Sequence, residues 1–239
     1  ISLPNRNFTL EYESTVPLRL GMGGSSAIIT AALRALMRYY DLRIPIEAQP
    51  QLVLETETRE LGVAAGLQDR VVQAYEGLVY MDFARELMEA RGYGEYERLD
   101  SKLLSGVYVA YRTSLSEGTE VFHNNVRERW RNGDAEVVNA MRTWASYAEQ
   151  GREALLRGDR PRLHALIDAN FDLRAQLYRL DAGNLEMVRL ARSVGASANF
   201  AGSGGAIVGL YEGEGMFAEL EKVLGAAGIA VVRPQIEAD

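Results

Sequence analysis

The stretch that decides the fold of this chain is Pro17-Leu18-Arg19-Leu20-Gly21-Met22-Gly23-Gly24-Ser25-Ser26-Ala27. This glycine-serine loop leads directly into an apolar segment rich in Ala, Leu and Ile, which predicts a helix from Ala27 to about Tyr40. Glycines let the backbone approach an anion closely, and the first N–H groups of the following helix point at that anion. The loop therefore predicts a phosphate site or, as the alternative, a tight glycine turn with a serine N-cap.

The loop is not a Walker A motif, because the only lysines of the chain, Lys102 and Lys222, are far from it in sequence. A second glycine-rich segment, Gly202-Ser203-Gly204-Gly205, lies between two apolar segments that read as strands. On its own this segment fits a hairpin turn or a bulge equally well. Two such loops near opposite ends of one chain suggest a single site assembled from both halves.

Three carboxylates are candidates for chemistry near the first loop. Asp69 follows Gly66 in a largely apolar segment, so it is either paired with a neighbouring arginine or placed to accept a proton. Glu57 and Glu60 lie on the helix expected before it, and either could offer a carboxylate to a metal ion shared with a serine oxygen. For Glu60, a solvated helix face is the competing interpretation.

Strands and helices mix along the chain without a regular βαβ cadence, so an α+β fold is expected rather than a doubly wound sheet. A polar stretch at residues 84–103 is the expected domain boundary. Hydrophobic periodicity predicts strands at 7–14, 78–83, 106–112, 197–201, 206–211 and 229–234, and helices at 27–40, 46–61, 119–131, 134–157, 161–179, 183–194 and 214–227.

Composition excludes several classes of protein. The chain has 239 residues, of which 47% are hydrophobic and 25% charged, which argues against disorder. It has no cysteine and two histidines, so a disulfide scaffold, a thiolate nucleophile and a His-rich metal site are excluded. A net charge of −7 argues against a nucleic-acid partner, and no apolar run reaches the ~18 residues of a membrane span. We expect a cytoplasmic enzyme or binding protein.

The three motifs together resemble those of the GHMP kinases, the family of sugar and mevalonate kinases. Residues 17–27 are similar to the ATP-binding motif of this family, and residues 198–206 to its C-terminal glycine-rich motif. Residues 66–70 resemble the segment that carries the catalytic aspartate in the galactokinase branch. Within the family, the chain most resembles the glucuronokinase branch, and the matching segments are residues 6–10, 60–73, 77–83 and 170–174.

The resemblance implies a two-domain α+β fold: a ribosomal-protein-S5-like N-terminal domain, partly missing, over residues 1–90 and a ferredoxin-like C-terminal domain over residues 91–239. The implied activity is an ATP- and Mg²⁺-dependent sugar kinase that phosphorylates D-glucuronate at its anomeric hydroxyl. The alternatives are the same chemistry on heptose, fucose or galactose, or a non-catalytic nucleotide- or sugar-binding relative. The family's first motif precedes this chain, so the resemblance also implies an N-terminal companion segment of the same protein.

The resemblance further implies roles for individual residues. Asp69 would take, or electrostatically orient, the proton of the sugar hydroxyl. Ser25 would bind Mg²⁺, with Ser26 as the fallback, and Glu57 would be the second ligand of the metal. The residues that would bind the phosphates of ATP are Gly21, Met22, Gly23, Gly24, Ser25, Ser26 and Ala27. Those that would brace the phosphate loop and the substrate are Gly202, Ser203, Gly204 and Gly205.

A glucuronate substrate adds one requirement, because its carboxylate calls for an arginine that can bind it in a bidentate manner. The candidates are Arg70, Arg112 and Arg174. The sequence does not choose between them.

Overall fold

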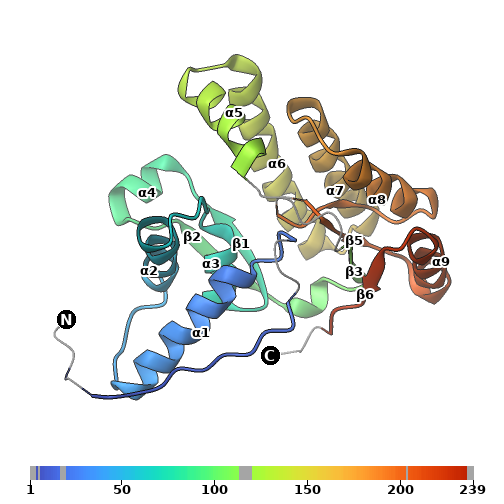
Figure 1. Ribbon diagram of the computed structural model, residues 1–239. Helices are drawn as coiled ribbons and strands as arrows, with labels where there is room; N and C mark the ends of the chain where they lie inside the picture. The colour runs from blue at the N-terminus through green and yellow to red at the C-terminus, as the bar shows by residue number, and fades with distance from the viewer. Residues whose placement is uncertain (1–3, 5, 17–19, 113–119, 203, 236–239) are drawn as a thin grey trace. The chain divides into compact units, whose positions relative to one another are not determined.

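The computed structural model of this chain describes residues 4, 6–16, 20–112, 120–202 and 204–235. The chain packs as two compact units (Figure 1). The first comprises Ile1–Val16 and Gly23–Asp100, and the second comprises Pro17–Met22 and Ser101–Asp239. Each unit mixes helices with an antiparallel sheet, so the α+β expectation is confirmed. None of the helices described is both long and apolar enough to cross a membrane.

The first unit combines helices with a two-stranded sheet, and helix α3 (Gln68–Tyr75) contacts several of its other elements. Both α1 and α2 contact α3, and the apolar side chains of Val53 and Val71 are buried there. The predicted helices at 27–40 and 46–61 are both present, although the second changes to a π-helical turn near its end. The elements of this unit are α1 (Gly24–Tyr39), α2 (Gln49–Glu55), η1 (Thr56–Glu60), α3 (Gln68–Tyr75), β1 (Leu78–Asp82), α4 (Arg85–Arg91) and β2 (Glu95–Leu99).

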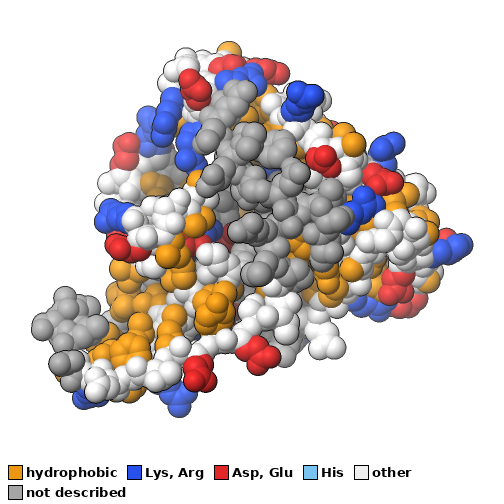
Figure 2. Space-filling view, viewed as in Figure 1, with side chains coloured by type: hydrophobic (Ala, Val, Ile, Leu, Met, Phe, Trp, Pro, Cys, Tyr) orange, Lys and Arg blue, Asp and Glu red, His pale blue; other side chains and the backbone are white. Residues whose placement is uncertain are grey.

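The predicted strand at residues 7–14 is wrong. These residues are assigned to no sheet, because no strand of the described chain pairs with them. The segment is tied to α1 instead: the Tyr39 hydroxyl donates a hydrogen bond of 3.0 Å to the Asn7 carbonyl oxygen, and the Phe8 ring contacts the rings of Tyr39 and Tyr40. Figure 2 shows hydrophobic side chains gathered on the surface over this segment and α1, where the side chains of Phe8 and Tyr12 are exposed.

The polar stretch at 84–103, which the sequence analysis expects to be the domain boundary, has regular secondary structure. It contains α4 and β2, and β2 pairs antiparallel with β1, with Leu78 opposite Leu99 and Asp82 opposite Glu95. This pairing holds residues 91–100 in the first unit, whereas the sequence places the division at residue 90.

The second unit is built on a four-stranded antiparallel sheet in the order β4-β5-β3-β6. Every helix and strand predicted after residue 105 is present, with ends that differ by at most three residues. The elements are η2 (Ser101–Leu103), β3 (Val107–Tyr111), α5 (Glu120–Arg131), α6 (Ala135–Arg157), α7 (Arg160–Leu177), α8 (Ala182–Ser193), β4 (Asn199–Phe200), β5 (Ala206–Leu210), α9 (Gly213–Ala226) and β6 (Ala230–Val232).

Aspartate N-caps fix where three of these helices begin. The side chains of Asp134, Asp159 and Asp181 accept hydrogen bonds from backbone N–H groups in the first turns of α6, α7 and α8. The apolar faces of α8 and α9 then pack on the sheet, where Met187 and Leu220 are completely buried. Helix α7 contacts both β4 and β5.

Candidate active site

The glycine-serine loop turns into α1 at Gly23, whose φ of +66° lies in the left-handed region that favours glycine. No side chain caps this end of α1, and its first turn contains no acidic residue. The Ala27 N–H donates to the Gly23 carbonyl oxygen at 3.0 Å and so belongs to the helix. The N–H groups of residues 24–26 have no intrahelical acceptor, so they are the donors that an anion would meet.

The two serines of the loop differ in their environment. Ser26 is fully buried, and its hydroxyl donates a hydrogen bond of 2.9 Å to the Gly23 carbonyl oxygen. Ser25 is exposed at the start of α1. The sequence-based choice of Ser25 over Ser26 as a metal ligand therefore falls on the serine whose side chain is open to solvent.

A residue to which the sequence assigned no role, Gln73 of α3, holds this loop in place. Its Nε2 donates to the Gly23 carbonyl oxygen at 3.0 Å, and its Oε1 accepts from the Thr30 hydroxyl at 3.3 Å. Asp69 and Gln73 are four residues apart on one helix and therefore share a face. The four-residue spacing between Asp69 and Gln73 could have predicted from the sequence that Gln73 also faces the loop.

Asp69 lies in the first turn of α3, beside the loop. A Cβ atom added to Gly23 would lie 3.5 Å from the Asp69 Cγ. The Asp69 side chain is 48% exposed, and its Oδ2 accepts a hydrogen bond of 3.2 Å from Arg70 Nη1. Partial burial raises the pKa of the Asp69 carboxyl, and the nearby Glu57 adds to this rise, while the charge of Arg70 opposes it. The carboxylate thus has an elevated basicity next to the predicted phosphate loop.

Glu57 lies on the π-helical turn η1 and is completely buried. Its Oε2 accepts hydrogen bonds from Arg70 Nε at 2.6 Å and from Arg70 Nη2, and Arg70 Nη1 also donates to the Gly66 carbonyl oxygen at 2.9 Å. Arg70 is itself only 6% exposed. Its guanidinium is therefore engaged by Glu57 and the backbone, which argues against Arg70 as the receptor for a substrate carboxylate.

The donors near the loop suit magnesium. The Glu57 Oε1 atom is buried and has no hydrogen-bond partner in the described part of the chain, so it retains its lone pairs for a cation. The described residues contain no cluster of three or more His, Asp or Glu side chains arranged around a metal. Magnesium commonly takes one or two protein ligands and completes its shell with phosphate oxygens and water. Glu57 offers a carboxylate oxygen and Ser25 a hydroxyl, both oxygen donors of the type that magnesium binds.

The second glycine-rich segment forms the turn between β4 and β5, closed by a hydrogen bond of 3.0 Å from the Ala201 N–H to the Ala206 carbonyl oxygen. Gly202 has a φ of +68°, and a Cβ added there would overlap the Gly21 carbonyl oxygen and lie 3.0 Å from the Gly21 Cα. The Gly205 N–H donates to Asn184 Oδ1 at 2.8 Å. Ser203 lies outside the described residues. The turn thus contacts the first residue of the phosphate loop.

Substituting Gly202 by Ala is expected to destabilise the second unit by about 2 kcal/mol or more, because the methyl group meets the Gly21 backbone and the left-handed conformation disfavours Ala. Gly228→Ala is the matched control: Gly228 has a φ of +71° and no atom near its added Cβ. Urea unfolding of both variants measures the loss in the free energy of unfolding. The loss in Gly228→Ala gives the cost of the left-handed conformation alone, and the excess in Gly202→Ala gives the cost of the contact with the Gly21 backbone. Equal losses of stability in the two variants would contradict the close approach of Gly202 to Gly21.

The two remaining arginine candidates differ sharply in their partners. Arg112 Nη2 donates to Glu186 Oε2 at 3.0 Å and to the Ala227 carbonyl oxygen at 2.9 Å. Arg174 lies over two aromatic rings, with its Cζ 5.5 Å from the Tyr178 centroid and 5.1 Å from the Phe200 centroid. Of the two, only Arg112 has a carboxylate partner among the described residues.

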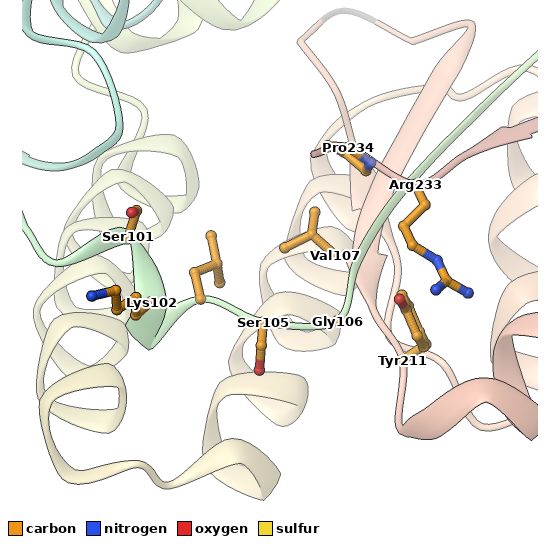
Figure 3. Close-up of a pocket in the computed structure, with 9 residues that line it drawn as sticks. Ser101, Lys102, Ser105, Gly106, Val107, Tyr211, Arg233 and Pro234 are labelled. Carbon is orange, nitrogen blue, oxygen red and sulfur yellow. The ribbon is translucent and has the colours of Figure 1, made fainter. Parts of the chain in front are cut away.

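A separate hollow of about 290 Å³ lies in the second unit (Figure 3). Figure 3 shows Arg233 extending alongside the Tyr211 ring there, and the guanidinium of Arg233 makes two hydrogen bonds, of 2.9 and 2.8 Å, to the Glu214 carboxylate. The residues that line the hollow include none of the predicted site residues: Ser101, Lys102, Leu104, Ser105, Gly106, Val107, Tyr211, Arg233 and Pro234. It is therefore not part of the candidate active site.

Comparison with known proteins finds similarity to one family of kinases. Residues 2–77 match the family model described as "GHMP kinases N terminal domain". The chain is 46% identical over 214 residues to "Probable glucuronokinase 2" of Arabidopsis thaliana, an alignment that covers 87% of this chain and 58% of that protein. The chain is thus similar to the GHMP kinases over these residues.

Two further comparisons concern a second curated relative and a solved structure. "Glucuronokinase 1" of Arabidopsis thaliana is 44% identical over 213 residues, again covering 87% of this chain and 58% of the relative. The crystal structure of L. major mevalonate kinase in complex with R-mevalonate shares the fold, with a TM-score of 0.67 at 23% identity, covering 90% of this chain and 67% of that one. The chain spans less than two thirds of the length of these curated relatives.

Proposed function

We propose that this chain carries the phosphate-binding loop and the catalytic carboxylate of an ATP-dependent kinase that phosphorylates D-glucuronate at its anomeric hydroxyl. The observation that carries the proposal is the position of Asp69 directly beside Gly23, at the start of α1. The similarity to proteins described as glucuronokinases supports the choice of acceptor.

In this reaction the bond between the γ-phosphorus and the β,γ-bridging oxygen of ATP breaks, and a bond forms from that phosphorus to the sugar oxygen. The free N–H groups at the start of α1 bind phosphate oxygens, which are most negative as the leaving group departs. Asp69 Oδ1 or Oδ2 accepts the proton that the sugar hydroxyl loses. The bonds from Gln73 and Ser26 to the Gly23 carbonyl oxygen keep the loop ordered for this step.

Magnesium bound with ATP would neutralise charge on the phosphoryl oxygens. We assign Glu57 and Ser25 as the residues of this chain that hold it. Arg70 positions the Glu57 carboxylate through its two hydrogen bonds to Oε2, which leaves Oε1 for the cation.

A coupled assay of ADP release tests the acceptor. We expect ADP release that depends on both glucuronate and Mg²⁺, with glucose, galactose, fucose and heptose much poorer as acceptors. Faster turnover of a neutral sugar than of glucuronate would refute the proposed acceptor while retaining the kinase. Tight ATP binding without turnover of any of these sugars would support a non-catalytic relative instead.

The raised pKa of Asp69 gives a prediction for the pH profile. The base must be unprotonated, so kcat/KM is expected to fall on the acid side, through an apparent pKa above the ordinary aspartate value of 3.8. Asp69→Asn is the control, since its residual rate should lack this limb while any protonation of ATP affects both proteins alike. The same acid limb in Asp69→Asn would show that another group is responsible.

A further inference from the structure

The side-chain amide of Gln73 reaches from α3 to the backbone at the start of α1, and the two helices pack against each other (Figure 1). Its Nε2 donates to the Gly23 carbonyl oxygen at 3.0 Å, and a Cβ added to Gly23 would lie 3.0 Å from the same nitrogen. All of these groups belong to the first unit. The amide of Gln73 therefore contacts the loop backbone directly, from an element outside the loop.

The Gly23 carbonyl and the Gly24 N–H belong to one peptide group, which is planar and trans, so the two bonds point in opposite directions. Whatever holds the carbonyl therefore also sets the direction of the N–H. Gly24 is the first residue of α1, and its N–H is one of the donors that an anion would meet. Neither glycine has a Cβ to restrict rotation of this peptide plane. Its orientation therefore depends on the hydrogen bonds that the carbonyl accepts.

In the described part of the chain, three donors reach the Gly23 carbonyl oxygen. The Ala27 N–H at 3.0 Å and the Ser26 hydroxyl at 2.9 Å both belong to α1. The third donor, Gln73 Nε2, belongs to α3, the helix that carries Asp69. Reversal of the peptide plane would break these bonds and turn the carbonyl oxygen, which repels an anion, toward the place where the N–H now points.

Thr30 determines which end of the Gln73 amide faces the loop. The buried Thr30 hydroxyl donates a hydrogen bond of 3.3 Å to Gln73 Oε1. An amide has donors at its nitrogen end and an acceptor at its oxygen end, so engaging Oε1 leaves Nε2 for the Gly23 carbonyl. Arg34, one turn further along α1, donates to the backbone carbonyl oxygen of Gln73 at 2.5 Å. The side chain and the backbone of Gln73 are thus both held against α1.

We propose that Gln73 is a positioning residue for the nucleotide: oriented by Thr30, it holds the Gly23–Gly24 peptide group so that the Gly24 N–H points at a phosphate of ATP. This inference rests on the proposed function and assigns two further residues to its phosphate site. A donor that is already oriented before the phosphate arrives has no ordering cost on binding. Hydrogen bonds accepted by the carbonyl also polarise the N–H of the same peptide group and make it a stronger donor.

The test compares Gln73→Met, which keeps the length of the side chain but removes the amide, with the wild type. The KM for ATP and its Kd from calorimetry are expected to rise about 5- to 30-fold, because one hydrogen bond that holds the peptide group is lost. The kcat at saturating ATP should stay within about threefold of the wild type, since the base is unchanged. A purely structural role would instead lower kcat through loss of folded protein and leave the KM for ATP unchanged.

Two variants of Thr30 test the orientation of the amide separately. Thr30→Val keeps the shape of the side chain but removes the hydroxyl, and should weaken ATP binding in the same direction as Gln73→Met, by about 2- to 10-fold. Thr30→Ser restores the hydroxyl and should recover most of the affinity. Gln51→Met is the matched control: Gln51 is a half-buried glutamine of the same unit, and its amide donates to Glu55 Oε1 at 3.1 Å. This control should bind ATP as the wild type does.

The combination of calorimetry and ADP release separates failure of this inference from failure of the proposed function. If the wild type binds ATP but releases no ADP with any sugar, the proposed reaction fails, and weaker ATP binding by Gln73→Met still supports the positioning role. If the wild type is an active kinase and Gln73→Met binds ATP as tightly as Gln51→Met, the positioning role is refuted and the reaction stands. A wild type that does not bind ATP would refute both. Should Gln73→Met fail to fold, ATP binding by Thr30→Val equal to that of the wild type would overturn the inference.

Discussion

Replacing Asp69 by Asn is expected to lower kcat about 10²- to 10⁴-fold while ATP binding stays intact, because the amide cannot accept the proton of the sugar hydroxyl. The change preserves the shape of the side chain, and the amide oxygen can still accept the hydrogen bond from Arg70 Nη1. Rates of ADP release at saturating ATP and sugar measure kcat, and calorimetric titration measures the affinity for ATP.

Asp41→Asn is the control for this prediction. Asp41 is exposed in the same unit and has a φ of +52°, a conformation that Asn accommodates. This variant should retain wild-type kcat. A kcat for Asp69→Asn within a few-fold of the wild type would remove Asp69 from the reaction.

Replacing Glu57 by Ala is expected to give the largest loss of stability in the first unit, about 3–5 kcal/mol, because it leaves the Arg70 guanidinium buried without a counter-charge. Glu57 is fully buried and the Arg70 side chain is nearly so, which keeps water from replacing the lost carboxylate. Urea or guanidinium unfolding measures the change in the free energy of unfolding.

Two further variants make this prediction specific. The double variant Glu57→Ala with Arg70→Met should lose less stability than the two single changes added together, since removing both charges leaves neither buried alone. Arg59→Ala breaks an ion pair of 3.3 Å with Glu55 on a 70% exposed side chain, and should cost less than about 1 kcal/mol. Additive losses in the double variant would show that the Glu57–Arg70 pair is not the source of the effect.

The helices and most strands were predictable because their apolar periodicity is local. The segments α6, α7 and α9 were placed to within two residues at either end from the spacing of their apolar residues alone. The strand expected at 7–14 failed for a non-local reason: alternation of side chains identifies an extended segment, but only a pairing partner makes it part of a sheet. The same reason explains the stretch at 84–103, whose β2 is polar and was recognisable only through its pairing with β1.

The sequence singles out candidate residues for the site but does not show how their side chains are connected. Pairing of Asp69 with a neighbouring arginine was one of the two interpretations of its sequence, but nothing in the motifs indicated that Arg70 also bonds to Glu57. Nor does a sequence reveal which arginine lacks a partner, because that depends on every acceptor packed around it. Arg70 and Arg174 are therefore distinguished by their burial and their ion-pair partners, which the sequence does not reveal.

The hydrogen bond from Gln73 to the Gly23 carbonyl oxygen links the glycine-serine loop to α3, the helix that carries the proposed catalytic carboxylate of Asp69. Asp69 and Gln73 are both on α3, so a thermal shift of that helix carries the loop carbonyl along with the carboxylate. Misplacement of reacting groups by about 1 Å can cost a hundredfold in rate. A movement of α3 shifts the Asp69 carboxylate and the Gly23 carbonyl together, so the distance between them changes little. The shared helix therefore protects the proposed reaction from this loss of rate.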